Sequence, residues 1–216
     1  MKTNELFDLE HTLAGNYLSA FSYGWESLPG ISEMILELSE TLSEEYEELW
    51  DKVLVHKTAR LSDTAYVKGP CIIGKGTEIR HGAFIRGSVL IGEDCVIGNS
   101  TEIKNSVLFD KVQVPHFNYV GDSILGYKVH FGAGAITSNV KSDKSLITVK
   151  GVSEIKTKLR KFGALVGDKS EIGCNTVLNP GTVIGKGCTV YPLSSVRGVI
   201  PDSYIYKSSD NIIRKE

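Results

Sequence analysis

The chain lacks any marked excess of charge, any long apolar run and all but a few aromatic residues. Its 216 residues include 24 Lys and Arg against 26 Asp and Glu, which gives a formal net charge of −2. So balanced a chain has no bulk electrostatic attraction for nucleic acid or an anionic membrane, and we expect neither as a partner. No apolar stretch reaches the roughly 18 residues that a transmembrane helix needs, so none is predicted.

Signatures of secretion and of metal binding are also lacking. The opening segment, MKTNELFDLE, becomes acidic before an apolar segment forms, so we expect no signal peptide and a cytoplasmic protein. The four cysteines, Cys71, Cys95, Cys174 and Cys188, show neither a CxxC nor a Cys/His spacing. We therefore expect reduced thiols and no metal site.

Glycine, by contrast, is abundant, at 22 residues, and from about residue 55 large apolar residues recur with a strict period of six. The first progression comprises Leu61, Val67, Ile73, Ile79, Ile85, Ile91, Ile97, Ile103 and Phe109, and the second comprises Val166, Ile172, Leu178, Ile184, Val190 and Val196. Small or β-branched residues stand two positions before each member of the first: Ala59, Ala65, Cys71, Thr77, Ala83, Val89, Cys95, Thr101 and Val107. Neither an α-helix nor an alternating strand has this period.

Hexad repeats of this kind are typical of a left-handed parallel β-helix, a mainly β fold in which three hexads form one triangular coil. We expect the large residue of each hexad to point into the prism and the small residue to lie near its corner. Cys71, Cys95 and Cys188 occupy the small position and are predicted to be buried, whereas Cys174 lies off it.

Residues 1–52 have a different pattern and are predicted to form a helical N-terminal segment with a docking or capping role. One helix is expected from about Leu9 to Ser22. The apolar residues that recur at helical spacing farther along are Leu36, Leu38, Leu42, Tyr46 and Leu49. We expect the β-helix over residues 53–207 and a C-terminal tail over residues 208–216.

The register of the hexads breaks twice. Between Phe109 and Tyr119 the count slips, and Tyr119, Leu125, Phe131 and Thr137 resume a weaker series. Residues 140–163 do not follow the six-residue period and are rich in lysine. We predict that they project from the prism as a hairpin. Breaks in a regular solenoid form loops, where functional residues concentrate.

Arg86 and Lys104 each follow an inward isoleucine and stand one predicted coil apart, so they are expected to stack, with Lys68 one coil before them. At about 5 Å and an effective dielectric near 20, two like charges repel by roughly 3 kcal/mol. Either a bound anion such as phosphate, or a solvated edge with Glu102 as partner, would offset this repulsion, and the spacing leaves both open.

His116 follows Pro115 in the first register break, about one coil beyond the Arg86 and Lys104 ladder. A lone histidine is more often structural, but this position favours a functional role such as a general base. His130 precedes Phe131 and is a candidate to line the same groove.

Two stretches, RGSVLIGEDCVIGNSTEIKNS and VPHFNYVGDSILGYKVHFGAGAITSNV, resemble the acetyltransferase domain of bifunctional N-acetylglucosamine-1-phosphate uridyltransferase/glucosamine-1-phosphate acetyltransferases. The resemblance is close over residues 86–139 and looser to about residue 200. The residues at the spacings of that family's substrate and catalytic residues are Arg86, Lys104, His116, Tyr119 and Asn139.

The resemblance implies a role for each matched position. His116 would be the general base that deprotonates the sugar 2-amine for attack on the acetyl-CoA thioester, and Glu102 would orient it. Arg86 and Lys104 would hold the sugar phosphate, with Tyr119 and Asn139 as further substrate-binding residues. The backbone amide of Ala133 would face the thioester oxyanion.

Three positions depart from that family. His130 stands where the family has an asparagine that contacts the substrate, and Cys174 and Pro192 replace a small serine and alanine in the coenzyme groove. The excursion at 140–163 is similar to the C-terminal region of archaeal sugar-1-phosphate nucleotidyltransferases that carry a second, acetyltransferase activity. The whole chain is similar to stand-alone UDP-N-acetylglucosamine pyrophosphorylase-related hexapeptide proteins. Residues 1–60 contain no Gly-rich nucleotide-binding motif, so nucleotidyl transfer by this chain alone is not expected.

These features lead to two hypotheses. The first is an acyl-CoA-dependent N-acetyltransferase of nucleotide-sugar metabolism that acts on an amino-sugar 1-phosphate, with acetyl-CoA as cosubstrate and no metal. We expect a homotrimer with grooves between neighbouring subunits. The alternative is a non-catalytic sugar-phosphate or nucleotide-sugar binding module associated with a separate nucleotidyltransferase. Whether Cys174 and Pro192 admit the coenzyme distinguishes the two.

Overall fold

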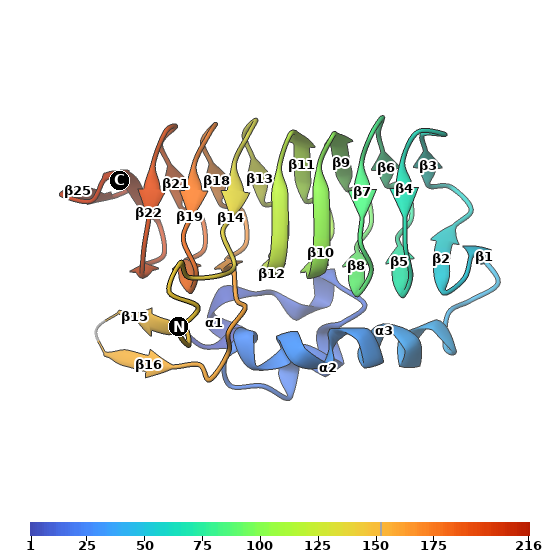
Figure 1. The fold of residues 1–216 in the computed structure, drawn as a ribbon, viewed down its shortest axis with the longest axis horizontal. Coiled ribbons are helices and arrows are strands. Elements are labelled where there is room, and N and C mark those ends of the chain that lie inside the picture. Colours follow the sequence, from blue (N-terminus) through green and yellow to red (C-terminus); the bar gives the residue numbers. More distant parts are fainter. Residues whose placement is uncertain (152) are drawn as a thin grey trace.

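Short parallel strands stack in successive coils to form an elongated prism (Figure 1). This computed structural model describes residues 1–151 and 153–216. The near strands β10 (Glu102–Leu108) and β12 (Tyr119–Leu125) run downward while the coils advance from right to left, which is a left-handed winding (Figure 1). The predicted left-handed parallel β-helix with a short helical N-terminal segment is therefore confirmed.

The prism has three faces, each built from one strand per coil. The back face contains β3 Arg60–Leu61, β6 Glu78–Ile79, β9 Val96–Asn99, β11 Gln113–His116, β13 His130–Phe131, β18 Glu171–Ile172, β21 Thr189–Val190, β24 Tyr204–Ser208 and β25 Asn211–Arg214. The front face contains β4 Tyr66–Val67, β7 Phe84–Ile85, the first halves of β10 and β12, β14 Ile136–Thr137, β19 Val177–Leu178 and β22 Ser195–Val196.

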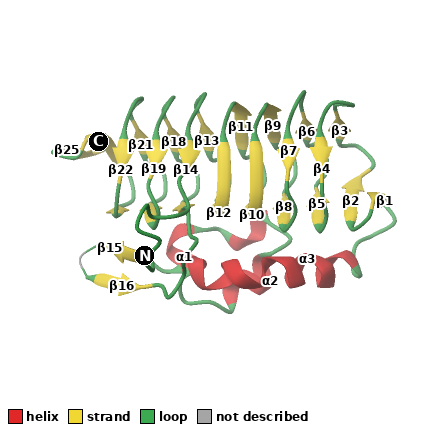
Figure 2. Ribbon diagram, in the orientation of Figure 1, coloured by secondary structure: helices red, strands yellow, loops and turns green. Residues whose placement is uncertain are grey.

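The third face is named the covered face, because the helices of the N-terminal segment lie against it (Figure 2). Its strands are β1 Tyr46–Trp50, β2 Val53–His56, β5 Cys71–Ile73, β8 Val89–Ile91, the second halves of β10 and β12, β17 Ala164–Val166, β20 Thr182–Ile184 and β23 Val199–Ile200. The helical elements are α1 Thr3–Leu6, η1 Leu9–His11, α2 Gly15–Ser19, η2 Gly24–Gly30 and α3 Ile31–Ser39, of which η1 and η2 are 3₁₀ helices.

The residues of the hexad progressions form the core of the prism. All members of both progressions are buried except Leu61, which is half-buried. Cys71, Cys95 and Cys188 are buried at the small position as predicted, and Cys174 is exposed.

Two successive coils are each one residue shorter than the coils before them: Glu102 pairs with Phe84 and lies 18 positions after it, but Tyr119 lies 17 positions after Glu102 and Ile136 lies 17 positions after Tyr119. The first of these short coils explains the first register break. Ile91 pairs with Leu108, and Leu108 pairs with Leu125, so Leu108 rather than Phe109 continues the inward column. The expected inward position of Phe109 is therefore wrong. Its ring is buried against Phe7 of the N-terminal segment instead, with ring centroids 5.3 Å apart.

The same shift moves two other predicted positions. Val107 pairs with Leu90 rather than with Val89, so it lies in the outward column and Ser106 takes the small position. Val120 rather than Tyr119 aligns with the inward Ile103.

The N-terminal segment differs from the prediction at two points. The helix expected from Leu9 to Ser22 is broken into η1 and α2, because the chain is extended at Thr12. The helix expected to continue to Leu49 is wrong: α3 ends at Ser39, and β1 pairs antiparallel with β2. The strand covers the open edge of the first coil, and an unpaired edge is costly to leave exposed.

The covered face depends on the N-terminal segment for its burial. Its outward-pointing apolar residues are Ile72, Leu90, Val107, Ile124, Leu165 and Val183, none of them more than 1% exposed. Helix α3 lies against β5, β8 and β10, and η2 lies against β12. A row of large apolar side chains on the outside of a prism is stable in water only when another element covers it.

The excursion at 140–163 contains the predicted hairpin. Strand β15 (Thr148–Lys150) pairs antiparallel with β16 (Glu154–Lys156), and Val152 between them lies outside the described residues. The stretch expected as a C-terminal tail instead contains β25, which pairs antiparallel with β24 beyond the last coil. Within the described residues, no helix is long and apolar enough to cross a membrane.

Shortening a side chain beneath the helices should destabilise the fold. Leu90→Ala removes a fully buried side chain from the interface with α3, so we expect the free energy of unfolding to fall by about 2–5 kcal/mol. Leu36→Ala, on the same helix but 37% exposed, is the matched control and should cost less than about 1 kcal/mol. Equal losses in denaturant unfolding would contradict the covering role of the segment.

The cysteines should differ sharply in reactivity. Burial raises the pKa of Cys95 to about 12 and also raises the pKa values of Cys71 and Cys188, so their thiols stay protonated near pH 8. Because the thiolate is the reactive form, a thiol reagent should modify only Cys174 in the folded protein and all four cysteines after unfolding. Rapid labelling of any thiol in the folded Cys174→Ser variant would contradict the burial of the other three cysteines.

Candidate functional site

One edge of the prism, where the back face turns into the front face, brings together four of the predicted residues. We call this edge, formed by His116, Ala133, Cys174 and Pro192 on successive coils, the His116 edge. Backbone hydrogen bonds link adjacent coils along it: Gly134 N to His116 O (3.0 Å), Asn175 N to Ala133 O (2.8 Å) and Leu193 N to Cys174 O (2.9 Å).

A shallow groove with a volume of about 380 Å³ runs beside the His116 edge. Cys174 and Pro192 line it together with Tyr191, and its walls are largely apolar. A Cβ on Gly132 would lie 2.6 Å from Cys174 N and 2.8 Å from its sulfur, so only glycine allows the two coils to approach here. An open apolar groove suits an extended, largely apolar chain.

His116 stands at the start of this edge with an exposed side chain. Its backbone N–H donates to Oδ1 of Asn118 (3.0 Å), and Nδ2 of Asn118 donates to the carbonyls of Gly132 (2.8 Å) and Ala135 (3.0 Å). The buried Asn118 amide therefore ties the shortened coil to the next one. This tie fixes the backbone of His116 and leaves its imidazole accessible.

The opposite edge of the front face, where it turns into the covered face, holds the predicted pair of stacked cations, Arg86 and Lys104, here called the cation ladder. The strand registers stack Arg86 on Lys104, but each cation already has a carboxylate partner. Arg86 donates to Glu102 (2.6 Å), and Lys104 donates to Asp122 (2.9 Å). The bond and charge of Glu102 raise the pKa of the Arg86 guanidinium. Glu102 is thus the partner of Arg86, as the solvated-edge alternative predicted. Lys68 stands one coil before Arg86 as expected, and its Nζ lies 5.5 Å from the centroid of the Tyr66 ring.

Asp122 is the main site residue that sequence reasoning missed. Its side chain is only 5% exposed and accepts hydrogen bonds from Lys104, Asn105 (2.9 Å) and Asn139. Asn105 also donates to the carbonyl of Leu28 (3.3 Å), which connects this buried carboxylate to the N-terminal segment. The strand register aligns Lys104 with Gly121, so counting in coils did not bring Asp122 to Lys104.

Tyr119 and Asn139 lie beside Asp122. Nδ2 of Asn139 donates to the Tyr119 hydroxyl oxygen (3.2 Å). Burial raises the pKa of Tyr119, and the nearby charges of Asp122 and Glu102 raise it further. The phenol therefore stays protonated at neutral pH and can donate a hydrogen bond to a ligand.

The structure thus gathers the predicted residues at two ends of one face. Arg86, Lys104, Tyr119 and Asn139 form one group, and the His116 edge forms the other. Gly121 aligns with Lys104, so the chain from His116 to Gly121 connects the two groups. At about 3.3 Å per residue, this segment spans at most about 16 Å, which is an upper limit on the backbone distance between them.

His130 belongs to neither end of that face. It lines the groove beside Cys174, with Nδ1 2.8 Å from Oε2 of Glu171, and does not join Lys104 and Asn139. Among residues 1–151 and 153–216, no three His, Cys, Asp or Glu side chains gather as a potential metal site.

Comparisons with known proteins agree with the resemblance seen in the sequence. The family profile of the GMPPB C-terminal domain matches residues 67–159. A protein named bifunctional protein GlmU from Methanococcus vannielii is 34% identical over 113 residues, which cover 51% of this chain and 27% of that protein. A bifunctional sugar-1-phosphate nucleotidylyltransferase/acetyltransferase from Sulfurisphaera tokodaii is 35% identical over 160 residues, covering 65% of this chain and 40% of that protein.

Among solved structures, the acetyltransferase domain of PglB from Neisseria gonorrhoeae, in complex with acetyl coenzyme A, covers 89% of this chain and 68% of that one. The sequence identity is 20% and the TM-score is 0.42. The chain spans between a quarter and two fifths of the length of the two curated relatives named above. The chain is therefore similar, over about half to two thirds of its length, to one part of bifunctional proteins named for nucleotidyl and acetyl transfer.

Proposed function

We propose that this chain is an acetyl-CoA-dependent N-acetyltransferase whose acceptor is an amino-sugar 1-phosphate of the glucosamine 1-phosphate type. The observation that carries the proposal is an exposed histidine on the same prism edge as Cys174 and Pro192 of the apolar groove, with two stacked cations at the opposite edge of the front face. The groove suits the pantetheine arm of a coenzyme, and the cations suit a phosphate. The similarity to acetyltransferase-containing proteins supports the same activity.

In the proposed reaction, the imidazole of His116 accepts a proton from the sugar 2-ammonium group, and the free amine attacks the thioester carbonyl carbon. The C–N bond forms, the C–S bond breaks, and the departing sulfur of coenzyme A takes up a proton. The oxyanion that develops would lie at the backbone N–H of Ala133, for which the described residues offer no intramolecular acceptor. Cys174 and Pro192 would border the pantetheine arm.

Binding of the acceptor would also release Glu102. A sugar phosphate at Arg86 and Lys104 competes with Glu102 and Asp122 for the same N–H donors. Asp122 is buried and held by three donors, whereas Glu102 is about a third exposed and free to turn. Glu102 can then orient the imidazole, the role that the resemblance assigns to it, while Tyr119 and Asn139 contact the sugar. His130 lies on the groove side, where it would meet the acyl donor rather than the phosphate.

The proposed assembly is a homotrimer in which neighbouring prisms form the walls of each groove. The turn residues beside the His116 edge include Phe117, 59% exposed, and Leu193, 80% exposed. Apolar side chains at a prism edge are suited to packing against a second copy. A closed trimer would convert the shallow groove of one chain into an enclosed coenzyme site.

A second candidate function is favoured by a different observation. Cys174 and Pro192 are larger than the residues that the resembled family has in its coenzyme groove, and a chain that cannot admit coenzyme would be a sugar-phosphate binding module. Such a module would serve a separate nucleotidyltransferase. Coenzyme binding therefore separates the two candidates.

The activity test measures thiol release from acetyl-CoA with glucosamine 1-phosphate as acceptor. His116→Ala should lower kcat by roughly 100-fold to 10,000-fold, the usual contribution of a general base. His81→Ala is the matched control, because His81 is exposed on the same edge two coils earlier, and it should leave kcat unchanged. If no thiol is released while glucosamine 1-phosphate still binds, the acetyltransferase hypothesis is excluded and the binding module is favoured.

Loss of Arg86 should weaken the binding of the acceptor without unfolding the protein. Arg86→Gln removes a charge-assisted partner of the phosphate, so the Kd for glucosamine 1-phosphate should rise at least about 10-fold by calorimetry. The Arg86–Glu102 pair is exposed, so the melting temperature should barely change. Arg80→Gln breaks a comparable surface pair with Glu78 and serves as the control. Equal Kd values for the two variants would show that the phosphate does not bind at Arg86 and Lys104.

A further inference from the structure

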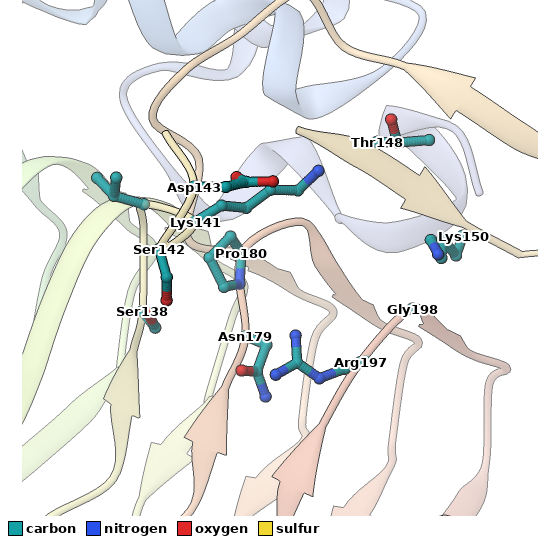
Figure 3. Close-up of a pocket in the computed structure, with 11 residues that line it drawn as sticks. Ser138, Lys141, Ser142, Asp143, Thr148, Lys150, Asn179, Pro180, Arg197 and Gly198 are labelled. Carbon is teal, nitrogen blue, oxygen red and sulfur yellow. The ribbon is translucent and has the colours of Figure 1, made fainter. Parts of the chain in front are cut away.

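A second basic pocket lies between the front face and the excursion, away from the His116 edge (Figure 3). Its volume is about 490 Å³. Ser138, Asn179 and Arg197 line it from the ends of β14, β19 and β22, and Lys141 and Lys150 line it from the excursion. We call it the Arg197 pocket. The hairpin β15–β16, which lies below the front-face strands and beside the helical segment in Figure 1, brings Lys150 to it.

The pocket continues the column that holds Arg86 and Lys104. Ser138, Asn179 and Arg197 each directly follow the inward residue of a front-face strand, as Arg86 and Lys104 do. Four coils separate Lys104 from Arg197, a distance of about 19 Å at the spacing of adjacent strands. One phosphate cannot contact both residues, so the Arg197 pocket is a separate position.

The charges of the two positions differ. Arg86 is paired with Glu102, whereas no carboxylate lies within ion-pair distance of Arg197 among the described residues. Figure 3 shows the Arg197 guanidinium beside the Asn179 carboxamide, which donates to Ser195 Oγ (3.0 Å) and to Val196 O (2.9 Å) and is thereby fixed. Arg197 is exposed at a concave, polar wall with no carboxylate within ion-pair distance among the described residues, so its guanidinium is available to an anion.

The excursion adds two cations and one carboxylate. Lys150 is 3.8 Å from Glu154, and both side chains are about 70% exposed, so this pair is weak. Nζ of Lys141 donates to the carbonyl of Leu146 (2.9 Å). The one acidic residue that lines the pocket, Asp143, accepts the Ser145 N–H (2.9 Å), which lowers the pKa of its carboxyl. Three cations against one carboxylate leave the pocket positive.

We propose that the Arg197 pocket binds a phosphate ester or diphosphate, through the guanidinium of Arg197, the ammonium of Lys150 and the hydroxyl of Ser138. The ligand could be the nucleotide portion of a sugar nucleotide or the phosphates of the acyl donor, which share this chemistry. The proposal concerns binding alone and holds whether or not the chain transfers an acetyl group.

The test uses inorganic pyrophosphate as the probe and starts from the Arg86→Gln, Lys104→Gln double variant, so that the ladder does not contribute. Calorimetry should still detect pyrophosphate binding by this variant. Adding Arg197→Gln should raise the Kd at least about 10-fold. Adding Arg160→Gln instead, which removes an exposed arginine of the excursion outside the pocket, should change the Kd less than about 2-fold.

The outcomes are distinct. Absence of pyrophosphate binding by the folded double variant at about 10 mM, or equal effects of Arg197→Gln and Arg160→Gln, would overturn the proposal. Once binding is established, competition by UDP or by coenzyme A identifies the source of the phosphate, and competition by the coenzyme but not by its 3′-dephosphorylated form would assign the pocket to the 3′-phosphate. A circular dichroism melt of each variant confirms that the fold is intact.

Discussion

The hydrogen-bonded stacking of each coil on the next is the constraint on which the positions of all candidate site residues depend. Because a coil advances by one strand spacing, a residue's place in its hexad decides its edge, and its coil decides its height. His116, Ala133, Cys174 and Pro192 share one edge for this reason, although 76 positions separate the first from the last. The shortened coil places His116 at an irregular point, where Asn118 ties its backbone to the next coil.

The N-terminal segment serves both the stability of the prism and the site. Its helices lie against β5, β8, β10 and β12 of the covered face and bury the outward apolar residues there, from Ile72 to Ile124, while strand β15 of the excursion lies against β20. The carbonyl of Leu28 accepts from Asn105, which also donates to Asp122, the buried partner of Lys104. The segment thus helps to fix the carboxylate that is paired with Lys104.

Much of the fold follows from the sequence, because a period of six leaves few alternatives to stacked coils. The inward residues, the buried cysteines and the stacking of Arg86 on Lys104 were predictable from spacing alone. The positions of Phe109 and Val107 were not, since the chain has one residue fewer between the inward Ile103 and Leu108 than a regular hexad, while the apolar character persists. The strand at Tyr46–Trp50 was also not predictable, because its leucine and tyrosine residues recur at the spacing of a helix. It pairs as a strand because the edge of the first coil is otherwise open. Glu102 was named from the sequence as a possible partner of the cations, whereas Asp122 was missed, because its contact with Lys104 depends on side-chain directions that spacing does not encode.

In the proposed function, an acyl donor binds at the His116 edge and a phosphorylated amino sugar binds at Arg86 and Lys104. A crystal structure with coenzyme A and glucosamine 1-phosphate tests this most directly. We predict the pantetheine arm in the groove beside Cys174 and Pro192, the phosphate within hydrogen-bond distance of Arg86 and Lys104, and the sugar amine facing His116. A sugar phosphate bound elsewhere, or a groove that stays empty at saturating coenzyme, would contradict the account.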